Sequence, residues 1–156
     1  MPATPVEIAT VGASVKWAIE QTPGVKPTVF ANTLLGVSSA PGFDMTPETI
    51  DVSDISDYFT QYVNGRQDPG GDAQFTLNHS EAAIDSWEAM VSAATTGLAS
   101  GLRCWFEYKY PGATRSYFWS GRPITLGNGG IEQNTASTIP AHVIPNGSFE
   151  WATASV

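Results

Sequence analysis

The segment Leu102–Tyr110 constrains the fold of this chain more than any other. Every second residue in it is apolar or aromatic: Leu102, Cys104, Phe106, Tyr108 and Tyr110. A period of two is typical of a β-strand that buries one face. Pro111-Gly112 then turns the chain and Arg115–Ser120 returns, so the sequence predicts a β-hairpin.

Similar alternation recurs along the rest of the chain. It predicts strands at Val11–Ile19, Asp72–Asn78 and Ser148–Ala152, and a weaker one at Val29–Val37. The single cysteine, Cys104, excludes an internal disulfide, and 156 residues are enough to form a core without one. The structure expected from these strands therefore depends on apolar packing alone.

One segment changes from strand spacing to helix spacing. Its apolar residues form a single stripe at helical intervals: Ile84, Trp87, Met90 and Val91. Asn78 and Glu81 resemble a capping box, and Gly97 is a plausible C-terminal stop. We therefore expect one helix that begins after Asn78 and buries this stripe.

Together these segments predict a mainly β protein. We expect an antiparallel β-sandwich or barrel with one flanking α-helix, a long loop and a terminal arm. The length favours a single domain over residues 1–156. No apolar run approaches the ~20 residues of a membrane-spanning helix, so no membrane association is expected.

The segment Asp51–Gly71 has neither a strand period nor a helix period. A long irregular connection is unusual in a compact domain and tends to be functional or mobile. It carries more large apolar residues than a solvated linker needs: Ile55, Tyr58, Phe59, Tyr62 and Val63. Asp51, Asp54 and Asp57 lack the spacing of an EF-hand loop, so we expect no metal, with a loose calcium site as the alternative.

Acidic residues are concentrated in one part of the chain. The net charge is −8, and residues 44–88 hold ten acids against one base, Arg66. Affinity for nucleic acid comes mainly from Lys and Arg, so tight DNA binding is not expected. The acids form a solvated loop, or repel an anion, or pair with the more basic second half of a neighbouring copy.

No combination of residues indicates catalysis. His79, Ser80 and Glu81 adjoin the start of the expected helix, where they serve as caps, whereas a catalytic relay is assembled from distant parts of a chain. Two histidines and one cysteine are too few for a zinc site without carboxylates. We therefore expect no enzyme and no catalytic, cofactor-binding or metal-binding residues.

Aromatic residues on the hairpin suggest a different class of function. Trp105, Tyr117 and Trp119 could share one face with Arg103 and Arg115, and aromatic faces stack on sugar rings. Cores and subunit interfaces use the same residues, and that interpretation is favoured. A carbohydrate-binding or receptor-binding accessory module is the alternative function.

The segment Ile131–Ile139 is polar on both faces, and we expect a strand there that Pro140-Ala141 breaks. Neither set of alternating residues is consistently apolar, so the strand cannot pack one face into an ordinary core. It could line a wet channel, contact another copy, or be an exposed edge strand.

The order of these features is the basis of a resemblance. A strand ending in Gly-Val-Ser-Ser-Ala-Pro-Gly-Phe-Asp (residues 36–44) leads to the acidic loop 46–57 and to Gly-Asp-Ala-Gln-Phe-Thr-Leu (71–77). A helix, the hairpin 104–119 and a polar strand follow, and Trp-Ala-Ile-Glu-Gln-Thr-Pro-Gly (17–24) precedes them. Over roughly residues 11–152 the chain resembles the major tail tube protein of long-tailed phages with non-contractile tails.

This resemblance implies a structural virion protein of the phage tail, assembled in the host cytoplasm. Six copies would form a ring, their sheets joining at open strand edges into an inner barrel, and rings would stack into a hollow tube for DNA ejection. DNA would pass without specific binding. Other partners would be the tape measure protein, the tail terminator and the tail tip proteins.

The resemblance also divides the candidate residues between two roles. Ring stacking would use the long loop, with the candidates Ile50, Asp51, Asp54, Ile55, Asp57, Tyr58, Phe59 and Tyr62. The inner sheet would come from strands 72–78 and 131–139, with the lumen candidates Asp72, Gln74, Glu132 and Asn134.

Overall fold

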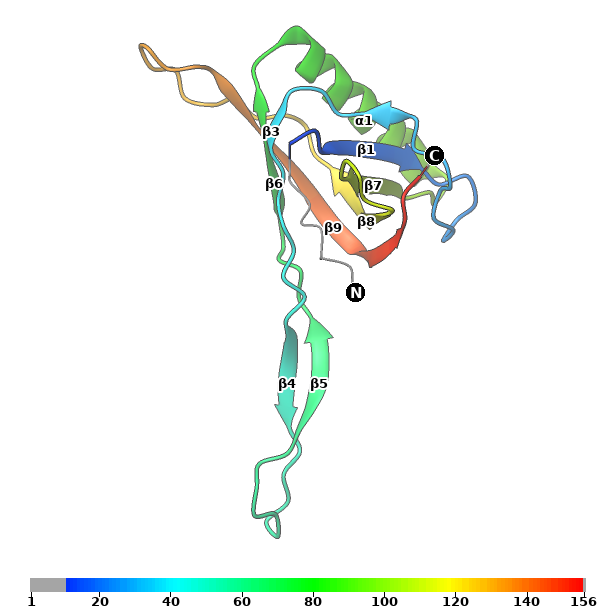
Figure 1. Cartoon of the computed structure of the whole chain (residues 1–156), viewed down its shortest axis with the longest axis vertical. Helices are drawn as coiled ribbons and strands as arrows, with labels where there is room; N and C mark the ends of the chain where they lie inside the picture. The colour runs from blue at the N-terminus through cyan, green and yellow to red at the C-terminus, as the bar shows by residue number, and fades with distance from the viewer. Residues whose placement is uncertain (1–10, 156) are drawn as a thin grey trace, which may run out of the picture.

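The computed structural model describes residues 11–155 and has a mainly β architecture with one helix. Seven antiparallel strands form a curled half-barrel in the order β2-β1-β7-β8-β9-β6-β3, and β4 pairs with β5 in a separate two-stranded sheet (Figure 1). The elements are β1 (Ser14–Ile19), β2 (Asn32–Thr33), β3 (Val37–Ser39), β4 (Pro47–Asp51), β5 (Tyr62–Gln67), β6 (Ala73–Asn78), α1 (Glu81–Ala99), β7 (Cys104–Lys109), β8 (Arg115–Pro123) and β9 (Thr138–Thr153). The expected fold class is confirmed.

A short segment links the two edges of the half-barrel. Only Leu34, Leu35 and Gly36 separate edge strand β2 from edge strand β3. The Leu34 amide donates to Val15 O on β1 (2.9 Å), and Gly36 O accepts from the Asn78 amide on β6 (2.7 Å). The weak strand expected at Val29–Val37 is therefore two very short strands, and the seven-stranded sheet lacks the long open edges expected of a lone sandwich.

Gly36 is required at this crossing for two reasons. Its φ is 73°, in the left-handed region that favours glycine. A Cβ at this position would lie 2.8 Å from the Cβ of Ala83 on α1. The crossing segment therefore passes closer to the helix than any side chain would permit.

The main core lies between the concave face of the sheet and α1. Trp87 and Met90 are fully buried, and Ile84 and Val91 pack against the core at partial exposure. Trp119 stacks on Phe106 with ring centroids 4.5 Å apart, and the Trp87 indole donates to Ile124 O at 2.8 Å. These aromatic contacts connect the helix to the centre of the hairpin β7–β8.

A smaller cluster lies on the opposite face of the sheet. It consists of Ala18, Phe30, Trp105 and Phe118. Residues 20–31 cover the face of the β7–β8 hairpin on which Arg103 and Trp105 lie. The hairpin is therefore buried on both faces. The expectation that Trp105, Tyr117 and Trp119 share one face is wrong, because Trp119 and Tyr117 pack in the main core.

The helix begins and ends slightly differently from the expectation. Ser80 is the N-cap, and its side chain accepts from the Ala83 amide at 3.1 Å, whereas Asn78 is the last residue of β6. Gly97 lies inside the helix and Ser100 is the C-cap. A Cβ at Gly97 would lie 2.9 Å from Ile19 Cγ2, so this glycine serves close packing of α1 on β1 and does not end the helix.

The final strand is much longer than expected. β9 pairs with β6 through its first part and with β8 through the remainder. Pro140 does not break this strand. Its carbonyl accepts from the Gly127 amide (3.2 Å), and in a strand the N–H of the same residue would point to that same side, toward the loop and away from β6. The absence of an N–H on Pro140 therefore removes no hydrogen bond between β9 and β6. Residues 131–137 form no strand; they belong to the protruding loop that precedes Thr138 (Figure 1).

The long loop is in fact a hairpin. Residues 46–68, here called the arm, contain β4 and β5 and project far from the body (Figure 1). Neither face of the arm is buried, so selection for an apolar alternation is absent, and this explains why the sequence shows no strand period. Ile50 pairs with Val63 and Asp51 with Tyr62.

The structure describes one end of the chain. A terminal arm formed by residues 1–10 would lie outside the described residues. At the other end, Ser155 is buried, and its amide donates to the buried Glu107 carboxylate at 2.8 Å. Among the described residues, no helix has both the length and the hydropathy to cross a bilayer.

Candidate assembly surfaces

The tip of the arm, residues 52–61, exposes an unusual amount of apolar surface. Ile55, Tyr58 and Phe59 have exposed fractions of 102%, 100% and 83%. Single exposed apolar residues are common on proteins, whereas three large ones together at the end of a projecting hairpin are typical of interaction surfaces and make the tip a candidate for one. The arm strands add Ile50, Tyr62 and Val63, each about half exposed.

The acids of the arm hold its turns in place. The Asp51 carboxylate accepts from the Ser53 amide (2.8 Å), and hydrogen bonding by the Ser53 side chain and amide together lowers the Asp51 pKa. Asp57 Oδ2 accepts from the Asp54 amide, and Asp54 Oδ1 from the Ile55 amide, both at 2.7 Å. These three acids therefore have a structural role as turn caps. Residues 11–155 hold no group of three or more His, Cys, Asp or Glu side chains suited to a metal ion.

The four lumen candidates belong to two separate segments, β6 with the residue before it and the loop before β9. Gln74 is exposed on β6 opposite His142, and Asp72 Oδ2 lies 2.8 Å from His142 Nδ1. Glu132 and Asn134 lie in the loop before β9, where Asn134 adopts a φ of 59°. The strand expected over residues 131–139 is present only at Thr138 and Ile139, where β9 begins, and residues 131–137 form no strand. Sequence reasoning missed His142, because only the register of β6 with β9 places it beside Asp72.

A groove of about 1200 Å³ opens at the base of the arm, and we call it the root groove. One wall is the segment from Thr33 to Met45, which leads into the arm. The other wall is aromatic and contains Tyr108, Tyr110, Tyr117, Phe149 and Trp151. The Tyr108 hydroxyl donates to Pro41 O at 2.8 Å and joins the two walls. Burial raises the Tyr108 pKa, so this phenol stays protonated as a donor.

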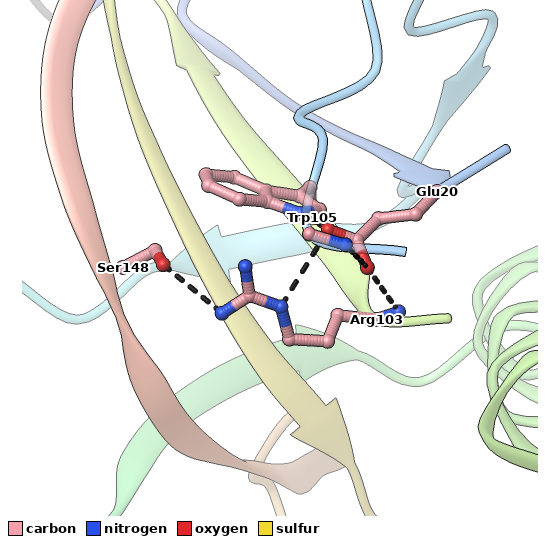
Figure 2. Close-up of polar contacts among 5 residues, drawn as sticks. Glu20, Arg103, Trp105 and Ser148 are labelled. Atoms are coloured by element: carbon pink, nitrogen blue, oxygen red, sulfur yellow. Dashed lines mark hydrogen bonds and ion pairs between the residues drawn. The ribbon is translucent and has the colours of Figure 1, made fainter. Parts of the chain in front are cut away.

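A buried carboxylate organises the opposite face of the sheet. Glu20 accepts from the Trp105 indole (2.9 Å) and the Arg103 amide (2.8 Å), as Figure 2 shows. The Arg103 guanidinium lies 3.5 Å from Glu20 and donates to the Ser148 hydroxyl at 3.0 Å. Burial alone would raise the Glu20 pKa, but these hydrogen bonds and the Arg103 charge lower it overall. Trp105 and Arg103 are therefore engaged in the fold and do not present a flat sugar platform.

The residues around the helix start form no catalytic relay. His79 Nδ1 lies 2.8 Å from the Ser137 hydroxyl, and Ser80 caps the helix. Glu81 is exposed in the first helical turn, where the helix dipole favours an acid. The contact between His79 and Ser137 holds the N-terminal end of α1 against the loop before β9.

Comparison with known proteins finds solved structures with a similar fold. No protein-family model matches the chain, and no curated protein matches it. A chain in the "Cryo-EM structure of the anti-feeding prophage (AFP) baseplate, 6-fold symmetrised" aligns with a TM-score of 0.55 and 8% identity over 98% of each chain. A chain in the "Virion of native gene transfer agent (GTA) particle" aligns with a TM-score of 0.56 and 12% identity, over 93% of this chain and 98% of that one. At these identities the similarity establishes a common fold.

Proposed function

We propose that this chain is a structural subunit of a phage tail tube. Copies form six-membered rings, and the rings stack into a hollow conduit for DNA ejection. The chain acts without catalysis, as a component of the virion tail. The observation that carries the proposal is the arm, a hairpin that projects from the body and exposes Ile55, Tyr58 and Phe59 at its end.

The arm supports assembly because the body cannot cover its tip. A two-stranded hairpin without a buried face gains little stability by itself. Burial of large apolar side chains against another copy stabilises each by about 1.5–3 kcal/mol. Contact through different surfaces of identical copies generates a ring or an open stack, which is the geometry of a tube.

The fold and the charge are consistent with a conduit. The two similar solved chains come from an anti-feeding prophage baseplate, symmetrised six-fold, and from a gene transfer agent virion. The net charge of −8 gives a subunit that repels phosphate, which suits passage of DNA without retention. The carbohydrate-binding alternative has lost its main support, since Trp105 and Trp119 lie on opposite faces of the sheet.

Electron microscopy tests the proposal directly. Purified protein is imaged at high concentration, alone and with the tail-tip initiation complex of its phage, because isolated subunits of such tubes can wait for an initiator. We expect tubes with a central hole and a regular axial repeat. Protein that stays monomeric beside a functional initiation complex contradicts the proposal.

A further inference from the structure

We propose that the root groove of one copy is the receptor for the arm tip of a second copy. This inference rests on the proposed function and specifies which two surfaces meet when rings stack. The occupant is a second copy of this chain, through residues 52–61.

The aromatic wall of the groove has the chemistry to receive an apolar tip. Trp151 remains 61% exposed in the single chain, although it contacts Tyr110 (centroids 6.5 Å apart) and Tyr117 (5.1 Å). Leu35 on the opposite wall is also exposed. Aromatic side chains around a partly open groove bury large area at low entropic cost when a partner arrives, as in interaction hot spots.

Geometry requires that the tip come from another copy. The groove is lined by residues 38–45 and Gln67, which form the base of the arm, whereas the tip lies at its far end (Figure 1). An arm therefore points away from its own groove. When each tip enters the groove of the next copy, the same displacement repeats from copy to copy, so growth continues in one direction.

One base next to the groove, Arg115, has a charge opposite to that of the tip. Residues 46–65 contain no Lys or Arg, so the tip is anionic through Asp54 and Asp57. Alternation along β8 puts the exposed Arg115 on the same face as Tyr117, which belongs to the aromatic wall of the groove. Of the two acids in the groove, Glu150 is neutralised by Lys26 at 2.8 Å, and Asp44 accepts from the Thr46 hydroxyl. Arg115 takes part in no ion pair within residues 11–155.

Cysteine crosslinking in assembled tubes tests the pairing. Ser56 at the tip and Ser39 in the groove are both exposed, and Ser→Cys changes little more than one atom. One preparation carries Ser56→Cys and another Ser39→Cys; they are mixed, assembled on the initiation complex and treated with a short bis-maleimide. Native Cys104 is buried and stays unreactive. The matched control replaces Ser39→Cys by Ser92→Cys, an exposed position on α1 outside the groove.

The outcomes separate this inference from the proposed function. A covalent dimer with Ser39→Cys and none with Ser92→Cys supports the groove as receptor. Tubes that form without the Ser56–Ser39 crosslink overturn the inference and leave the tube proposal standing, with the groove serving another occupant. Unmodified protein that forms no tubes overturns both.

A charge exchange gives a second, independent measurement. Arg115→Glu is expected to raise the concentration needed for tube growth by about tenfold, and Ser56→Lys in the same chain is expected to restore it. Ser56 makes no side-chain contact that caps the tip, so this rescue preserves its turns. Growth that is unchanged by Arg115→Glu contradicts the inference even if the cysteine variants assemble poorly.

Discussion

At the scale of single residues, Glu20 illustrates what a sequence pattern conceals. It lies in a stretch rich in turn residues, yet its carboxylate is almost fully buried and accepts hydrogen bonds from residues far along the chain. Nothing in the local sequence distinguishes it from an exposed acid, because its partners meet it only after β1 and β7 have paired.

We predict that Glu20→Gln lowers the free energy of unfolding by about 1–3 kcal/mol at neutral pH, since buried donors on Trp105 and Arg103 lose a charged acceptor. The Glu20 pKa is lowered from 4.5, so the stabilisation is present above that pH and is lost as the pH falls through the folded-state pKa. Urea unfolding at pH 7 and pH 3 checks this: the gap between the variant and the unmodified protein shrinks at the lower pH. Glu150→Gln is the surface control, with a loss below about 1 kcal/mol; a gap that stays constant with pH contradicts the prediction.

A second prediction at this scale concerns Gly121 on β8. A Cβ there would lie 2.5 Å from Val143 Cγ1 and 2.9 Å from the Trp119 ring. Gly121→Ala therefore overpacks the core and is expected to cost about 1–3 kcal/mol in thermal or urea unfolding. Gly71→Ala, which meets nothing within 4 Å, is the matched control. Equal stability of the two variants would contradict the close packing of Gly121 on β8 against Val143 on β9.

At the scale of elements, strands with a buried face were predictable and those without one were not. β1, β6, β7 and β8 show apolar alternation because one or both faces pack in the core. The arm strands β4 and β5 are exposed on both faces. Because neither face packs in a core, their sequences show no alternation of apolar and polar residues. β9 was predicted only in its last part, Ser148–Ala152, because Pro140 suggested a break and only the pairing partners show where a proline is tolerated.

The arm gives the main prediction at this scale. Asp51 and Tyr62 are Cα partners, so residues 52–61 can be replaced by a two-residue Asn-Gly turn that closes the shortened hairpin. We expect an unchanged melting temperature, because no core residue is removed, together with loss of tube growth in electron micrographs. Replacing the same number of residues in the other projecting loop, around Ile131, is the control. Normal tubes from the shortened arm would exclude it as the stacking element.

At the scale of the whole molecule, the candidate site was foreseen in part. Composition showed that the acidic connection has more large apolar residues than a solvated linker needs, and the resemblance to tail tube proteins supplied their expected role in ring stacking. The root groove was not foreseen, because its walls come from the segment before the arm and from β7, β8 and β9. Only the folding of the chain into the curled half-barrel brings these walls together.

The last prediction concerns passage of DNA. Tubes of the unmodified chain are expected to retain no duplex DNA at about 150 mM salt, because retention requires clustered Lys and Arg. Gln74→Lys places one base per copy beside Asp72 and His142, and tubes of this variant should retain DNA with an affinity that falls as salt increases. The control, Gln133→Lys, places the base in the loop before β9. Gln74→Lys tubes that behave like the control would show that β6 faces away from the bore.

The crossing of Leu34–Gly36 between β2 and β3 affects how readily this protein would aggregate. Aggregation commonly starts when an unpaired edge strand of one sheet forms backbone hydrogen bonds with a strand of another molecule. In the body, one backbone hydrogen bond joins the crossing to β1 and another joins it to β6, so the edges of the large sheet are the very short strands β2 and β3, which offer little backbone for pairing with a second sheet.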